Sequence, residues 1–265
     1  MESKAARLFL GAWTVMIMLF LFIPIAIIVV YAFNASNIQS WPIAGFSLRW
    51  FGETWANEAV RHALWLSVKV ALFATTISIV LGSLAAFAVH YYRFPGRESI
   101  AFLVVLPIAL PGIITGMALS SFFVVTGVNL SMLTIIIGHA TFCIVIVYNN
   151  VIARLRRVPR SLSEASMDLG GDAFYTFRRV TLPMISTSVV SGGILAFALS
   201  FDEVIVTTFT AGAQNTLPLW IFGAIRLGQK LPEVNVVVLI VMLFTLIPVL
   251  LSYRMMNKAP ASAGR

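Results

Sequence analysis

Long apolar runs alternate with short polar segments along the chain, and they predict helices that cross a membrane. Crossing the hydrocarbon core takes about 20 consecutive, mostly apolar residues. We expect six such helices, at residues 8–33 (broken by Pro24), 64–89, 100–124 and 133–153, from near residue 182 onward, and at 234–253. The pattern therefore predicts an all-α, polytopic membrane protein.

Composition supports this class of protein. Hydrophobic residues make up 60% of the chain and charged residues 11%, whereas soluble domains carry about 25% charged residues. The first apolar run has an alternative interpretation as a cleaved signal peptide, but it exceeds the roughly 7–15 residues of a signal core and lacks a clean small-x-small site. The single Cys143 excludes a disulfide framework within the chain.

Positive charge is distributed unevenly between the loops. With a cytoplasmic N-terminus, all of the 18 Lys and Arg residues fall in cytoplasmic segments except Arg49, Arg61, Lys69, Arg226 and Lys230. The positive-inside rule then places both termini in the cytoplasm, so the net charge of +8 reflects topology and we expect no nucleic-acid partner. On the outer side, the aromatic residues within 46–61 predict a helix in the membrane interface.

One polar segment, SLSEASMDLGGDAFYTFRRVTLP at residues 161–183, stands out from its apolar surroundings. Ser161 and Glu164 have the spacing of a capping box, which predicts a helix start. Gly170 can end that helix in a left-handed conformation. Asp172 can cap a second short helix, which we expect to end at Arg178–Arg179.

This segment has the features of a docking element, because small residues at the middle of the first helix allow another body to approach closely. The alternative is a plain connecting loop. The spacing resembles the EAA signature of ABC importer permeases: E-A-A, three residues, Gly, nine residues, an aliphatic residue, any residue, Leu-Pro. The matching positions are Glu164, Ala165, Ser166 (the one departure), Gly170, Val180, Leu182 and Pro183. Pro183 falls in the first turn of the fifth span, where its missing donor costs little.

The resemblance implies a type I ABC importer permease core over roughly residues 66–251, and a coupling helix, including Asp168, that sits in a groove of a cytoplasmic ATPase. It divides the chain into a first span with a periplasmic interfacial segment (1–63), a core of five spans with a coupling loop at 154–181 (64–254), and a cytoplasmic tail (255–265). The stretch GAIRLGQK at 223–230 lacks the Gly-Lys-Ser/Thr ending of a phosphate loop. We therefore expect no catalytic residues and no cofactor in this chain, with ATP-Mg bound and hydrolysed by a partner ATPase dimer.

Three further stretches resemble the polyamine/opine branch of these permeases, and in particular the permeases of spermidine/putrescine importers: LPIALPGIITGMAL at 106–119, GHATFC at 138–143, and LAFALSFDEVIVTTFTAG at 195–212. This resemblance implies a bacterial inner-membrane importer in which two different permeases, an ATPase dimer and a periplasmic binding protein transport a small amine. Membrane lipid is the remaining expected partner.

Asp202 and Glu203 are the first candidates for the substrate path. They interrupt a run that is otherwise uncharged from residue 180 to 213. At 1.5 Å per residue, Asp202 lies about 30 Å along a span that begins at Leu182, near its outer edge. Acids within a span are expensive and usually face a pathway, where a carboxylate pair would attract an ammonium group. The alternative is that the two acids cap an outer helix or pair with Arg226 or Lys230.

The third span supplies further candidates, namely Pro111, Gly112 and Thr115. In polyamine permeases of this kind an acid follows the proline, whereas here Gly112 does, and this difference favours a singly charged or zwitterionic amine such as 4-aminobutyrate as an alternative substrate. Gly112 and Gly116 form a GxxxG pattern, which indicates helix packing or ligand contact. Pro107 and Pro111 can kink the span and free carbonyl groups.

His139 makes the fourth span unusually polar, and it is a candidate gate or proton site as well as a packed, hydrogen-bonded side chain. No His, Cys and carboxylate cluster has the spacing of a metal site. An ion-coupled secondary transporter, with Asp202, Glu203 and His139 as a relay, is the rival function. That class commonly shows inverted repeats, which this sequence lacks. A third alternative, a structural subunit of a respiratory or assembly complex, would not require the spacing from Glu164 to Pro183.

Overall fold

The computed structural model describes the backbone of residues 4–258 and side chains up to Leu246, so residues 259–265 of the expected tail lie outside the described residues. The described chain is helical, and its one pair of bridged extended residues is Asn34 with Phe46. Two compact units form, one from Met1–Val60 with Ile221–Arg265 and the other from Arg61–Trp220.

Four helical segments are long and apolar enough to cross a membrane: α1 (Lys4–Ala32), α3 (Glu58–Tyr91), α6 (Met132–Leu155) and the continuous stretch Ala173–Asp202. The pair α4 (Arg97–Ala109) and α5 (Gly112–Val125) is long and apolar enough when taken together, but it bends by 106° at its junction, which is the geometry of a broken span or of a re-entrant loop. The sixth expected span corresponds to α12 (Leu231–Lys258). The break predicted at Pro24 is wrong, because α1 continues through that proline, as helices in lipid can when other groups compensate for the lost bond.

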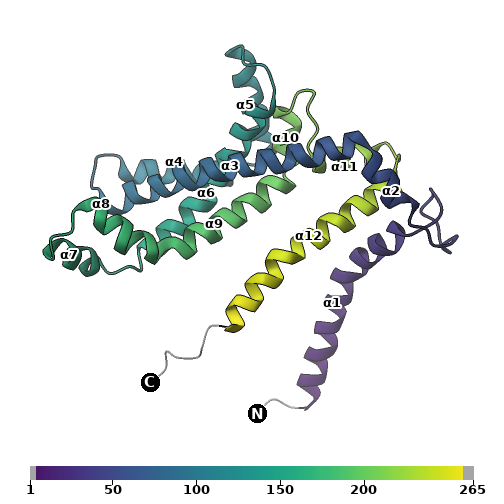
Figure 1. Ribbon diagram of the computed structural model, residues 1–265, viewed down its shortest axis with the longest axis horizontal. Coiled ribbons are helices and arrows are strands. Elements are labelled where there is room, and N and C mark those ends of the chain that lie inside the picture. The colour runs from purple at the N-terminus through teal and green to yellow at the C-terminus, as the bar shows by residue number, and fades with distance from the viewer. Residues whose placement is uncertain (1–3, 259–265) are drawn as a thin grey trace. The chain divides into compact units, whose positions relative to one another are not determined.

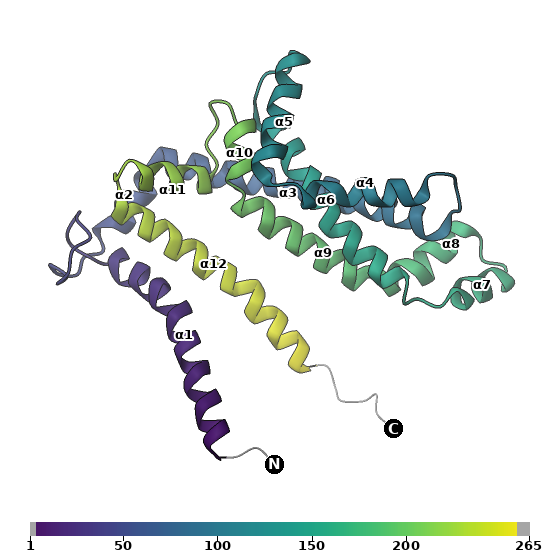
Figure 2. The same cartoon turned by 180° about the vertical axis from the view of Figure 1, so that it is seen from behind.

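In the first unit, α1 and α12 meet beside α2 (Arg49–Ala56), and their far ends, which carry the two termini, lie at the same end of the unit (Figures 1 and 2). Ala32, Trp50, Val236 and Leu239 form the core at the junction. The Trp50 indole N–H donates to the Asn34 carbonyl at 2.7 Å. The helix expected at 46–61 is therefore present, but its Trp50 packs into this core.

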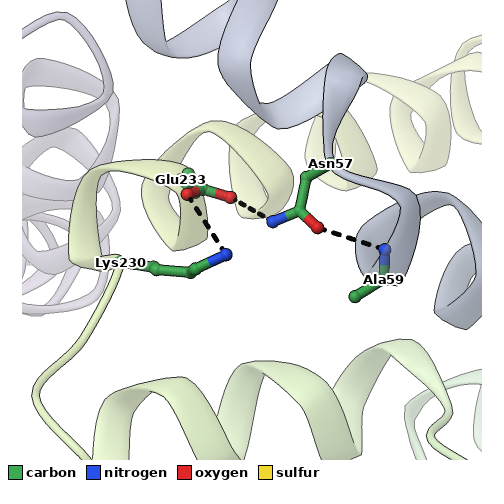
Figure 3. A network of polar contacts seen from close by, with 4 residues as sticks. All are labelled: Asn57, Ala59, Lys230 and Glu233. Carbon is green, nitrogen blue, oxygen red and sulfur yellow. Dashed lines mark hydrogen bonds and ion pairs between the residues drawn. The ribbon is translucent and has the colours of Figure 1, made fainter.

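Asn57 links two helix starts within this unit (Figure 3). Its amide oxygen accepts from the Ala59 N–H at 3.1 Å, in the first turn of α3, and its amide nitrogen donates to Glu233 Oε2 at 2.6 Å, in the first turn of α12. Lys230 Nζ lies 3.8 Å from Glu233 Oε1. A carboxylate in the first turn of a helix is favoured by the helix dipole, so Glu233 has a structural role here.

In the second unit, α3, α6 and α9 (Leu182–Asp202) pack through glycines. A Cβ on Gly82 of α3 would lie 2.8 Å from the Ile144 carbonyl oxygen of α6, and one on Gly192 would lie 3.2 Å from Val147 Cα. Small residues let membrane helices approach until their backbones touch. The apolar core around Val147 and Ile185 is buried at this contact.

The bend between α4 and α5 falls at Leu110–Pro111. Leu110 is extended, with ψ of 140°, which is the conformation that a following proline imposes. Pro107 lies inside α4, so Pro111 makes the break. After it, α5 leaves the layer of α3, α4, α6 and α9 and packs against α10 (Ile205–Thr210), away from α7 (Arg160–Asp168) and α8 (Ala173–Thr176) (Figures 1 and 2).

Candidate functional site

Helix α7 carries the residues of the expected coupling segment. It begins at Arg160 after Pro159, and no side chain caps it, so the capping box predicted at Ser161 is wrong. The first turn is closed by the backbone instead, since the Leu162 N–H donates to the Pro159 carbonyl at 3.3 Å. Glu164, Ala165 and Asp168 are exposed, and no α7 side chain is buried.

The end of α7 confirms the prediction for Gly170, which has φ of +86°. The Gly170 N–H donates to the Met167 carbonyl at 2.9 Å, and the Gly171 N–H donates to the Ser166 carbonyl at 2.9 Å. This pair of bonds is a Schellman motif. A Cβ on Gly170 would meet nothing within 4 Å, whereas one on Gly171 would lie 2.8 Å from the Ser166 carbonyl oxygen.

Asp172 caps α8 as predicted, with its Oδ1 accepting from the Tyr175 N–H at 2.6 Å. The predicted end at Arg178–Arg179 is wrong, because α8 continues through a π-helical turn (Phe177–Thr181) into α9. The Leu182 N–H bonds to the Phe177 carbonyl, five residues back. This wider turn directly precedes Pro183, whose ring would clash with the carbonyl four residues earlier in a regular α-helix.

We expected Ser166 to be exposed, but it is partly buried on the side of α7 that faces α8. Its Oγ lies 2.9 Å from Oγ1 of Thr176, which is 4% exposed. Ser166 therefore ties α7 to α8. Neither Thr176 nor Gly171 was predicted as a functional residue, although the glycine pair was a signal for a tight turn.

The two short helices expose an apolar surface. Its members come from α7, from the turn that follows and from α8, and are Leu162, Met167, Leu169, Phe174 and Tyr175. Leu169 is 89% exposed. Exposed apolar patches on a folded protein are typical of interaction sites, so this segment is suited to docking.

The predicted acidic pair lies where α9 ends. Asp202 is the last residue of α9, and it is exposed and has no hydrogen bond or ion pair to any described residue. Glu203 is half-buried, and its Oε1 accepts from the Val206 N–H at 2.9 Å. The capping alternative therefore applies to Glu203, while the Asp202 carboxylate stays available to a ligand.

His139 is 1% exposed and bonds at both ring nitrogens, with Nδ1 2.8 Å from Ser200 Oγ and Nε2 2.8 Å from Thr207 Oγ1. It therefore packs within the protein and joins α6 to α9 and α10. Neither Ser200 nor Thr207 was predicted, because hydroxyl groups are common in membrane helices and nothing local marks these two.

The glycines of the third span pack against α10. Ideal Cβ atoms on Gly112 and Gly116 would lie 3.7 Å from Ile205 and 2.7 Å from Phe209, respectively, so the GxxxG pattern serves helix packing. Pro111 is exposed at the start of α5. The hydroxyl oxygen of Thr115 is buried without a partner among the described residues.

A polar groove of about 370 Å³ lies between the C-terminal end of α6 and the N-terminal end of α9. Asn149, Asn150, Ala153, Arg154, Arg157, Thr187 and Ser188 line it. The Arg154 Nε–H donates to the Met184 carbonyl at 2.9 Å, which fixes that guanidinium. With two arginines and no acid in its lining, the groove is unsuited to binding a cationic amine.

A comparison with protein families gives the identity of this arrangement. The model of the binding-protein-dependent transport system inner membrane component matches residues 78–259. The chain belongs to this family. It is a multi-pass membrane protein and a transport subunit rather than an enzyme, as the resemblance implied.

Curated relatives match most of this permease. It is 38% identical over 236 residues to the putrescine transport system permease protein PotI of Escherichia coli strain K12, covering 84% of this chain and 83% of that one. It is 33% identical over 256 residues to the spermidine/putrescine transport system permease protein PotC of Haemophilus influenzae, covering 96% and 98%.

Solved structures support the fold. A chain of a bacterial ABC transporter involved in the import of the acidic polysaccharide alginate superposes with a TM-score of 0.68 at 16% identity, covering 98% of this permease and 99% of that chain. A chain of the MetNI methionine ABC transporter gives 0.64 at 15% identity, covering 78% and 97%. The predicted all-α importer permease fold is therefore confirmed.

Proposed function

We propose that this permease forms half of the translocation path of an ATP-driven importer for small amines of the spermidine/putrescine kind. The observation that carries the substrate class is the Asp202 carboxylate, which is exposed at the end of α9 and has no partner among the described residues. Acids within membrane spans usually face a pathway, and Asp202 lies in the last turn of this helix. The names of the relatives PotI and PotC support the same class.

The exposed apolar surface of α7 and α8 is where we propose that a cytoplasmic ATPase dimer docks. A second permease would complete the path, and a periplasmic binding protein would deliver the amine. Both termini are proposed to be cytoplasmic, which agrees with the ends of α1 and α12 lying at the same end of their unit (Figure 1). The divisions at 1–63, 64–254 and 255–265 belong to this proposal.

The substrate test uses the complete importer in proteoliposomes, with uptake of labelled putrescine, spermidine and 4-aminobutyrate measured at varied concentration. Asp202→Asn should raise the half-saturating concentration of the transported amine about tenfold, because a charge-assisted hydrogen bond contributes about 1.5 kcal/mol. The matched control is Glu98→Gln, an exposed acid in the first turn of α4.

Each outcome has a defined meaning. Unchanged kinetics in Asp202→Asn would remove this carboxylate from the path. Uptake of 4-aminobutyrate in preference to the diamines would favour the zwitterionic substrate, in keeping with Gly112 standing where an acid was expected.

A further inference from the structure

Hydrogen bonds between side chains connect three helices at the turn that carries Asp202 and Glu203. We call this turn, residues 202–207, the acidic corner. His139 of α6 lies between Ser200, on the last turn of α9, and Thr207 of α10. All three side chains are at most 2% exposed. Hydrogen bonds in so dry an environment fix geometry strongly, because a displaced group finds no water to replace its partner.

The direction of these bonds follows from the donors available. Thr207 Oγ1 lies 2.7 Å from the Glu203 carbonyl oxygen, which can only accept, so the one hydroxyl proton of Thr207 is donated there. Thr207 must then accept from His139, which places a proton on Nε2. In a neutral imidazole Nδ1 is bare and accepts from Ser200.

The chain of bonds ends on the residue that shapes the corner. At Glu203 the helix breaks, with ψ of 119°. Its carbonyl is held by Thr207 and its carboxylate by the Val206 N–H. At its far end α10 has a second polar tie to α6, where Thr134 Oγ1 lies 2.7 Å from the Thr210 carbonyl oxygen. Next to the corner, its other contacts are apolar ones onto glycines, such as Val206 Cγ1 at 3.0 Å from an ideal Cβ on Gly138. Such apolar contacts set distance but not rotation, so at the corner the bond to Thr207 fixes how this six-residue helix is turned.

We propose that His139, as the neutral Nε2–H tautomer, is a positioning residue: it orients α10 through Thr207 and the capping residue Glu203, and thereby holds the Asp202 carboxylate in the geometry that receives the amine. This role rests on the proposed function of the corner. His139 itself touches no substrate and acts as neither gate nor proton carrier.

Two substitutions of His139 separate the roles of its two ring nitrogens. The amide of His139→Gln can reach the place of Nε2 and donate to Thr207, whereas the amide of His139→Asn can replace Nδ1 but falls short of Thr207. We expect the Asn variant to raise the half-saturating amine concentration about tenfold with little change in maximal rate, and the Gln variant to stay within about twofold of the wild type. Thr207→Val should resemble the Asn variant, and Thr207→Ser the wild type. Equal kinetics for Thr207→Val and Thr207→Ser would overturn the proposal.

A second measurement does not depend on transport. In a Cys143→Ala background, which removes the single cysteine, a spin label on Thr208→Cys, exposed on α10, reports the mobility of that helix within the assembled importer. We expect a mobile component in His139→Asn and Thr207→Val, but not in His139→Gln and Thr207→Ser. A label on Val190→Cys, exposed on α9, should be insensitive to all four variants.

The two readouts distinguish failure of the positioning role from failure of the proposed function. If the wild-type importer takes up no amine, the proposed function fails, and the spin label still tests whether His139 orders α10. If uptake works and the label on α10 is equally immobile in all four variants, the positioning role is refuted. The Cys143→Ala background is also a control, because Cys143 bonds from α6 to the Ala196 carbonyl of α9 and does not reach α10.

Discussion

Replacing Gly171 by alanine tests whether the geometry between α7 and α8 matters for transport. The new Cβ would lie 2.8 Å from the Ser166 carbonyl oxygen and 2.9 Å from Ser166 Oγ, about 0.6 Å short of ordinary contact with the carbonyl oxygen. Relieving that clash lengthens the hydrogen bond from the Gly171 N–H to the Ser166 carbonyl. It also moves the Ser166 hydroxyl away from Thr176, so the hydrogen bond between these two side chains is weakened as well. Two hydrogen bonds at about 1 kcal/mol each amount to about 2 kcal/mol, or roughly a thirtyfold shift away from the native arrangement.

The assay compares ATP-dependent uptake with the amount of importer assembled in the membrane. We expect Gly171→Ala to assemble normally and to lose most of its uptake, because only the docking segment is displaced. Gly170→Asn should retain more activity, since its Cβ meets nothing and asparagine tolerates a left-handed backbone. Gly52→Ala, at an open helical position, is the control for added bulk. Wild-type uptake by Gly171→Ala would refute the reasoning.

Three further changes test the packing. Gly82→Ala should prevent stable insertion, seen as proteolysis of the permease, because its Cβ would meet backbone that cannot move aside. Gly116→Ala should reduce uptake, because the new Cβ would clash with the Phe209 side chain. Phe209→Ala removes that side chain and should restore uptake in the double variant, and failure to restore it would contradict this explanation. Asn57→Ala should lower the thermal unfolding midpoint of the purified permease, because Glu233, 9% exposed, loses the hydrogen bond to its Oε2 at a cost of about 1–3 kcal/mol. An unchanged midpoint would count against a stabilising role for this link.

Features that depend on a few neighbouring residues were predictable from the sequence. The apolar runs marked the spans, and Gly170 and Asp172 marked a helix end and a helix start, because a left-handed glycine and an Asp cap act within one turn. The capping box at Ser161 was predicted from the same kind of local signal, and that prediction is wrong. The helix already begins at Arg160, after Pro159, so Ser161 lies inside it and cannot be its N-cap.

Features that depend on tertiary contacts were out of reach. His139 bonds to residues 61 and 68 positions away, and the partner that decides its tautomer, Thr207, lies on a helix of six residues with no periodic pattern of its own. The continuity of α8 with α9 was missed because a π-helical turn accommodates Pro183, where sequence rules expect a helix to start afresh.

The central claim, that an external ATPase drives solute through this permease, is tested most directly by uptake into proteoliposomes, measured both with and without an imposed ion gradient. The complete importer should accumulate putrescine or a related amine only when ATP is supplied on the ATPase side together with the binding protein. Accumulation by the purified permease alone, without nucleotide and in response to an imposed ion gradient, would contradict the account.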